Sequence, residues 1–503
     1  MKKIYSWMTV MAAVLSLGFT SCSDNDEPKK EESAAPELLS FSFNVAENSE
    51  VLSADCVGVI SDADKTVKVT MPAFADKSSL IATFTVAEGN TVLVNGITQE
   101  SGKTANDFNA PVDYIISNTK GDKNIKYTVT IEKSADYVWS EVARYTEVVP
   151  RGSNAVMKLN ITDNVPYIGF VSKASNKMVV VKNENGNFSY VGGNEVESTN
   201  VASGRFDFTV SNNGTPYFIY GDNDCSSLKA AATVMSFNGS AWSTVGDAGI
   251  AGFVPSKLQI GVLGSEVIAP MVVNANKGSF QKREVYSSIY NNGWQTNSMA
   301  SVGINNAAVE CMSTTANAAY LYTISAATYK YSVAMFKDGS WKALRSEYLE
   351  EGATQAPILM ADAASIVGTN DGVIYLLTAD DKETGSVKDM RFRVLKYTPD
   401  TEEWTLVGGS TISSIKADDS HISAKLAVAP DGTPFLAYTD YKGDKCAKVQ
   451  YFDNDTKQWS EPITLSAENA SSISIEFCDN GEAYISFVGK DDNIVLMKYA
   501  AKK

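Results

Sequence analysis

The sequence predicts an all-β protein: an N-terminal Ig-like β-sandwich followed by a seven-bladed β-propeller that is closed by pairing of its first and last strands. Three observations predict this class. Short runs of alternating apolar and polar residues, typical of half-buried strands, recur along most of the chain. The 23 Tyr residues against a single His suit strands better than helices. Large aromatic residues also recur roughly every fifty residues, the length of one four-stranded propeller blade. These aromatic residues are Trp139, Phe188, Trp242, Trp294, Trp341, Trp404 and Trp459.

Residues 1–21 have the features of a lipoprotein signal peptide. Two lysines precede an apolar stretch that ends at Phe19, and this stretch is too short for a stable membrane span. Cys22 follows small residues and resembles the lipid-attachment cysteine of a bacterial lipobox, with Phe19 standing where Leu is usual. The alternative is an ordinary signal peptide that leaves Cys22 unmodified.

Residues 22–36 are polar and carry several acids, so we expect a flexible tether. An acidic run directly after the lipid cysteine resembles the export signal of Bacteroidota surface lipoproteins. This resemblance implies an outer-membrane protein held by its N-terminal lipid and facing the cell exterior. The sequence leaves open a plain solvated linker and a protein that faces the periplasm.

Residues 37–134 are expected to form the Ig-like β-sandwich. About seven short strands in about a hundred residues are typical of that fold, and the run from Leu39 to Val45 alternates as a strand does. The stretch from Val92 to Thr104, followed by Pro111-Val-Asp-Tyr114 and Tyr127-Thr-Val-Thr-Ile131, is similar to the N-terminal module of many Bacteroidota surface lipoproteins. The resemblance implies a spacer between the membrane and the next domain.

Residues 135–503 are expected to form the propeller. The sixth repeat shows its plan: an inner strand from Ala424, the turn Asp431-Gly432, a second and a third strand, and Trp459 on the outer strand. Asn-Gly and Asp-Gly pairs favour such tight hairpins. The first repeat has an outer strand near Trp139 without inner strands, and the last repeat lacks an outer strand. Joining the two completes one blade and removes the exposed sheet edges.

Composition and motifs exclude several functions. The formal charge of −16 opposes binding to nucleic acid. Ser-His-Asp catalysis would need the single His421 placed beside both a Ser and an acid in the fold, and nothing in the local sequence suggests that arrangement; the chain also contains no HExxH, P-loop or GxSxG motif. The sequence therefore predicts no catalytic residues, no cofactor and no metal. Paired loop acids such as Asp491-Asp492 could hold Ca²⁺, but none has the spacing of a calcium loop.

A ligand site is expected on the propeller face that carries the loops between second and third strands. Tyrosine offers an apolar ring with a polar tip, which suits stacking on sugars, and nearby carboxylates can accept hydrogen bonds from hydroxyl groups. For each tyrosine the competing interpretation is packing in the core. The predicted ligand-binding residues are Tyr220, Asp222, Tyr329, Asp380, Tyr438, Asp440 and Tyr441.

These features favour a non-catalytic surface lipoprotein whose propeller binds an extracellular ligand, first of all a glycan. One alternative is a polysaccharide hydrolase or lyase that uses carboxylates and tyrosines for acid–base chemistry. Another is an interaction component of the envelope whose partners are other envelope proteins. The fold alone does not separate them, because propellers serve all three purposes.

Overall fold

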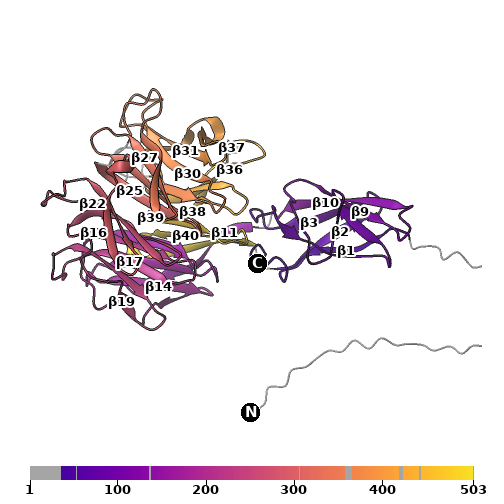
Figure 1. Cartoon of the computed structure of the whole chain (residues 1–503), viewed down its shortest axis with the longest axis horizontal. Coiled ribbons are helices and arrows are strands. Elements are labelled where there is room, and N and C mark those ends of the chain that lie inside the picture. Colours follow the sequence, from indigo (N-terminus) through magenta and orange to yellow (C-terminus); the bar gives the residue numbers. More distant parts are fainter. Residues whose placement is uncertain are drawn as a thin grey trace, which may run out of the picture.

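The computed structural model describes residues 35–52, 54–134, 137–304, 306–356, 365–417, 423–440 and 443–501. Within these ranges an N-terminal sheet domain precedes seven sheets of four or five strands, arranged in a ring (Figure 1). The predicted all-β class and seven-bladed propeller are thus confirmed. Cys22, the signal peptide, nearly all of the tether, His421 and Tyr441 lie outside the described residues, so lipid attachment stays a prediction. No helix in the described ranges is long and apolar enough to cross a membrane.

The N-terminal domain is built around one core. Its main sheet has the strand order β5-β1-β2-β3-β10-β9-β6-β7, in which β3 and β10 run parallel. Alternate residues such as Val67 and Val69 of β3 are fully buried among aromatic rings of the other strands. The Ig-like classification stays a prediction. The strands are β1 (Leu38–Phe43), β2 (Cys56–Ser61), β3 (Thr66–Met71), β4 (Leu80–Ile81), β5 (Thr83–Val86), β6 (Thr91–Val94), β7 (Ile97–Thr98), β8 (Ala105–Asn106), β9 (Val112–Ser117) and β10 (Asn124–Lys133).

Each blade is an antiparallel sheet that runs from an inner to an outer strand. Blade 1 comprises β12 (Pro150–Leu159), β13 (Pro166–Ser172), β14 (Met178–Glu184) and β15 (Asn187–Tyr190). Blade 2 comprises β16 (Val201–Val210), β17 (Pro216–Asp222), β18 (Ala231–Phe237) and β19 (Trp242–Thr244). Blade 3 comprises β20 (Pro255–Leu258), β21 (Gly261–Leu263), β22 (Glu266–Val273), β23 (Val285–Tyr290) and β24 (Trp294–Ser298). Blade 4 comprises β25 (Ala307–Thr314), β26 (Ala319–Ser325), β27 (Tyr331–Lys337) and β28 (Ser340–Tyr348).

Blades 5 and 6 each carry an additional strand that pairs with their third strand. Blade 5 comprises β29 (Ser365–Gly368), β30 (Ile374–Asp380), β31 (Met390–Thr398), β32 (Glu403–Leu406) and β33 (Ile412–Ala417). Blade 6 comprises β34 (Ser423–Val428), β35 (Pro434–Thr439), β36 (Cys446–Asp453), β37 (Gln458–Trp459) and β38 (Ile463–Asn469). Three short 3-10 turns are η1 (Ala300–Val302), η2 (Val407–Gly409) and η3 (Lys490–Asp492).

Blade 7 closes the ring in the way the sequence predicts. Its strands β39 (Ser471–Phe477), β40 (Ala483–Val488) and β41 (Ile494–Ala501) come from the end of the chain, and its outer strand is β11 (Tyr137–Tyr145). The pairing is antiparallel and extends from Tyr137 opposite Ala501 to Tyr145 opposite Ile494. The first strand after the N-terminal domain therefore supplies hydrogen-bond partners for what would be an exposed edge.

The recurring aromatic residues all lie on outer strands and link neighbouring blades. The indole N–H of Trp242 in blade 2 donates to the Val191 carbonyl of blade 1 over 2.9 Å. Trp294 of blade 3 repeats this contact with Val245 of blade 2, again over 2.9 Å. The repeat in the sequence is thus a repeat of blade-to-blade packing.

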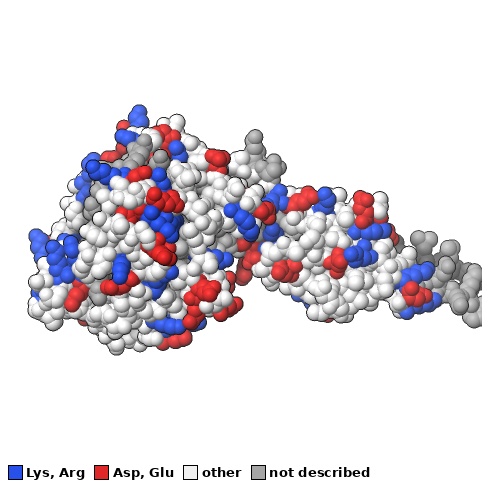
Figure 2. Space-filling view, turned by 90° about the horizontal axis from the view of Figure 1, so that it is seen from above, with Lys and Arg blue, Asp and Glu red and all other residues white. Residues whose placement is uncertain are grey.

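The N-terminal domain packs against blades 6 and 7, beside β11 and the end of β41 (Figure 1). Phe74, in the loop after β3, inserts among propeller rings, and its centroid lies 4.8 Å from Phe435 and 5.8 Å from Tyr499. Gly481 permits this approach, because a Cβ there would lie 2.7 Å from the Ala75 nitrogen. Figure 2 shows the narrowed junction and mixed charges on both domains.

Candidate functional site

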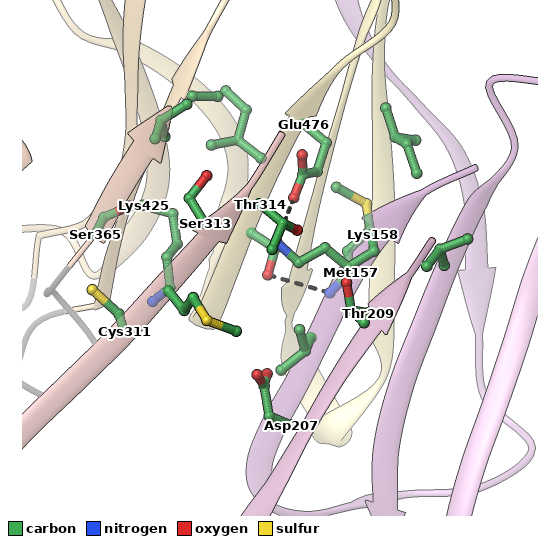
Figure 3. A pocket seen from close by; sticks show the side chains of 18 of the residues that line it. Met157, Lys158, Asp207, Thr209, Cys311, Ser313, Thr314, Ser365, Lys425 and Glu476 are labelled. Atoms are coloured by element: carbon green, nitrogen blue, oxygen red, sulfur yellow. Dashed lines mark hydrogen bonds and ion pairs between the residues drawn. The ribbon is translucent and has the colours of Figure 1, made fainter. Parts of the chain in front are cut away.

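The first strands of all seven blades line a cavity of about 470 Å³ along the propeller axis, which we call the central channel. These strands are β12, β16, β20, β25, β29, β34 and β39. Hydroxyl, amide and charged side chains alternate with apolar ones along its wall, and Figure 3 shows several of them from close by. The volume falls within the usual range for small-molecule sites.

The channel wall contains an ion pair between its first and last blades. Lys158 of β12 lies 3.0 Å from Glu476 of β39, and Figure 3 shows the two side chains meeting across the blades. The Glu476 carboxylate raises the pKa of Lys158. Both side chains keep about a third of their surface accessible, so a ligand in the channel could reach the charged groups.

Asp207 of β16 is the second charged feature of the channel. Its Oδ2 accepts a hydrogen bond from the Ile260 N–H of blade 3 over 2.9 Å. Burial raises the pKa of Asp207 to about 6, although that hydrogen bond and the positive charge of Lys158 favour the ionised form. Desolvation therefore outweighs the favourable contacts, and the carboxyl group titrates close to neutral pH.

The inner strands are joined by side chains that accept backbone hydrogen bonds from the next blade. The serine acceptors are Ser472 for Ala155, Ser423 for Ile473, Ser365 for Leu426 and Ser313 for Gly368, over 2.9 to 3.2 Å. Asp207 makes the same contact between blades 2 and 3. Four blades thus make this kind of contact through a neutral hydroxyl group, and blade 2 makes it through a carboxylate.

Four of the predicted ligand-binding residues are buried between the sheets, namely Tyr220, Asp222, Asp380 and Tyr438. Tyr220 and Tyr438 are almost fully buried, and burial raises the pKa of both. Asp222 accepts hydrogen bonds from the Asp224 N–H and the Thr233 hydroxyl. Tyr220, Asp222 and Tyr438 lie one strand away from the channel wall, because their strands β17 and β35 pair with the inner strands β16 and β34.

Asp380 is also buried, at the end of β30, where it forms an ion pair with the equally buried Arg393. Burial raises the pKa of Asp380 despite this partner. Such a pair leaves no side-chain surface for a ligand in this conformation.

Tyr329 and Asp440 are only partly buried. Asp440 accepts a hydrogen bond from the Gly443 N–H over 3.2 Å. None of the six described residues lines the central channel, and they are spread over blades 2, 4, 5 and 6. Their role in ligand binding stays a prediction.

Sequence reasoning did not select the charged residues of the channel. Lys158, Asp207, Lys425 and Glu476 each lie on an inner strand between two apolar neighbours. A single charge among the apolar residues of an inner strand is costly unless it is paired or solvated. A lone charge between two apolar residues of an inner strand is thus the signal in the sequence that marks these channel residues.

The described residues contain no group of three or more His, Cys, Asp or Glu side chains that could hold a metal ion.

The N-terminal domain matches a known family. The family model described as "SGBP, N-terminal" matches residues 39–131, and proteins of this family are typically exposed on the surface of Bacteroidota and bind glycans. No curated protein is significantly similar to the chain.

Solved structures are similar at low identity only. An ulvan lyase of a polysaccharide lyase family is 10% identical over 73% of this chain and 96% of its own, with a TM-score of 0.45. A quinoprotein alcohol dehydrogenase-like protein from Bacteroides thetaiotaomicron is 11% identical over 86% and 96%, with a TM-score of 0.36. AofleA from Arthrobotrys oligospora is 11% identical over 66% and 91%, with a TM-score of 0.41.

Such distant similarities indicate no activity. The family match covers the N-terminal domain alone.

Proposed function

We propose that this chain is a lipoprotein of the outer membrane, attached through Cys22 and facing the cell exterior, whose propeller binds a glycan. The match of residues 39–131 to the N-terminal module of glycan-binding surface proteins carries this proposal. In this arrangement the N-terminal domain holds the propeller away from the membrane. At the junction with the propeller, Phe74 of the N-terminal domain inserts among propeller rings.

The geometry of the propeller supports binding of a polar ligand. The central channel combines hydroxyl groups with the Lys158–Glu476 pair, and sugars are recognised by such groups. The partly exposed Tyr329 and Asp440 are the predicted residues best placed to contact a glycan at the surface.

The proposal is tested by a glycan array with the chain that begins after the signal peptide. We expect saturable binding to a restricted set of oligosaccharides and weaker binding by Lys158→Ala. Ser243→Ala, an exposed position on β19, is the matched control. Failure to bind any glycan, with capture of an envelope protein instead, would favour the interaction component. Protease treatment of intact cells tests the location, since protection of the chain would contradict exposure at the exterior.

The raised pKa of Asp207 favours a second candidate function. A carboxyl group with a pKa of about 6 is suited to proton transfer near neutral pH, and Lys158 and Glu476 line the same channel. A hydrolase or lyase that uses these residues would release products from an oligosaccharide. Product release that is lost in Asp207→Asn would establish this alternative.

A further inference from the structure

A second cavity lies at the junction of the two domains. It encloses about 590 Å³ between the N-terminal domain and the outer parts of blades 6 and 7, and we call it the junction cleft. Its lining includes Phe74 and Lys133 from the N-terminal domain and Trp139, Tyr451, Asp455 and Tyr499 from the propeller. Binding sites occur preferentially at domain interfaces and in this volume range.

One wall of the junction cleft is aromatic. The Tyr499 ring lies 5.2 Å from Trp139 and 5.4 Å from Tyr137, measured between centroids and with the rings tilted. All three rings are only partly buried. Val138 and Ile463, which also line the cleft, are 43% and 41% exposed. The cleft therefore presents apolar surface that the fold leaves uncovered.

The same wall offers hydrogen-bonding groups without partners. The phenol oxygens of Tyr137, Tyr451 and Tyr499 form no hydrogen bond with any other group in the described part of the chain. Burial raises the pKa of Tyr499, and the neighbouring phenols of Tyr451 and Tyr137 add to this effect. Polar groups at an apolar wall that lack protein partners are available to a ligand.

Acidic and amide groups form the rim. Asp455 is largely exposed and lies 3.6 Å from Lys133 of the N-terminal domain. Asp453 accepts hydrogen bonds from the N–H groups of Asp455 and Thr456, which hold its carboxylate in place. The lining contains two aspartates against one lysine, so the rim favours a neutral ligand over an anionic one.

We propose that the junction cleft binds a neutral pyranose unit of an oligosaccharide. The apolar face of the sugar ring packs on the aromatic wall, and its hydroxyl groups bond to the free phenols and to Asp455. This inference rests on the proposed function and names a site and a ligand class for it.

The cleft depends on how the domains dock. Phe74 forms part of its wall while its ring packs on Phe435, and Gly481 permits the close contact with the loop after β3. The N-terminal domain is thus part of the binding site as well as a spacer.

Titration calorimetry on the chain that begins after the signal peptide tests the inference, with cellohexaose, xylohexaose, mannohexaose and hexagalacturonate as probes. We expect a neutral probe to bind and Tyr499→Phe, Tyr451→Phe and Asp455→Ala each to weaken binding about three- to tenfold, as for loss of one hydrogen bond. These substitutions are conservative or exposed, and unchanged melting temperatures verify the fold.

Two matched controls lie outside the cleft. Tyr290 packs on Trp294 in blade 3 with the same centroid distance of 5.2 Å, and Asp247 is an exposed acid after β19. Tyr290→Phe and Asp247→Ala should keep the affinity of the wild type. Binding of a neutral probe that all three cleft variants retain would overturn the cleft and leave the proposed function intact. A wild type that binds only hexagalacturonate, or none of the probes, would overturn the cleft alone, because the glycan array decides the proposed function.

Discussion

Replacing Asp207 by Asn should stabilise the propeller at neutral pH and leave its stability almost unchanged near pH 4. Burial holds the pKa of Asp207 at about 6, above its ordinary value of 3.8, so the folded protein binds the proton more tightly than the unfolded chain. Stability therefore falls as the pH rises from about 4 to about 6, and the full cost is present above that range. Each unit of difference between the pKa of Asp207 in the folded protein and in the unfolded chain corresponds to about 1.4 kcal/mol of stability.

The expected gain is about 1 to 3 kcal/mol. The upper value is the full cost of ionising this carboxyl group in the channel, and contact with water in the channel lowers it. Asn keeps an oxygen that can accept the hydrogen bond from Ile260, which Asp207 now accepts over 2.9 Å. The blade-to-blade contact should thus survive without the buried charge.

Urea unfolding at about pH 4.5 and about pH 7.5, followed by near-ultraviolet circular dichroism, measures the difference. The difference in the free energy of unfolding between variant and wild type should increase as the pH rises. Asp247→Asn, at an exposed acid, should show no such difference at either pH. A gain in Asp207→Asn that is equal at both values, or a loss at neutral pH, would refute the assigned cost of burial.

Three further predictions concern the ring and the domain junction. Deleting residues 137–145 removes the partner strand of β41 and should abolish the single cooperative thermal transition of the propeller; an unchanged melt would contradict ring closure. Arg144 donates two hydrogen bonds to Glu468, over 2.7 and 3.2 Å, so Arg144→Ala should cost about 1 to 3 kcal/mol in urea unfolding. Equal stability of variant and wild type would show that this pair contributes nothing. Phe74→Ala should cost about 3 kcal/mol and separate the melting of the two domains in calorimetry, whereas Phe74→Leu should keep a joint transition; joint melting of both variants would contradict docking through this ring.

Most of the propeller could be predicted from the sequence, because the recurring aromatic residues reflect a packing contact that recurs between neighbouring blades. Trp242 and Trp294 recur at the blade length because each indole bonds to the preceding blade. The closing strand followed from the count of strands at the two ends, and the pairing of β11 with β41 confirms it. These features depend on local periodicity and on the need to cover sheet edges, which a single sequence displays.

The channel and the junction cleft depend on contacts between distant segments. Lys158 meets Glu476 only because the first and last blades are neighbours in the closed ring. The junction cleft needs the docked position of Phe74, which no periodic pattern encodes. Tyr220 and Tyr438 illustrate the opposite case, since their place near loop ends suggested exposure while neighbouring blades bury both.

Equilibrium dialysis of the chain that begins after the signal peptide against a neutral oligosaccharide, followed by recovery and chromatography of that saccharide, tests the central claim most directly. A surface protein that binds glycans without transforming them should show saturable uptake and return the oligosaccharide intact. Absence of saturable uptake, or recovery of shortened or unsaturated products, would contradict the claim.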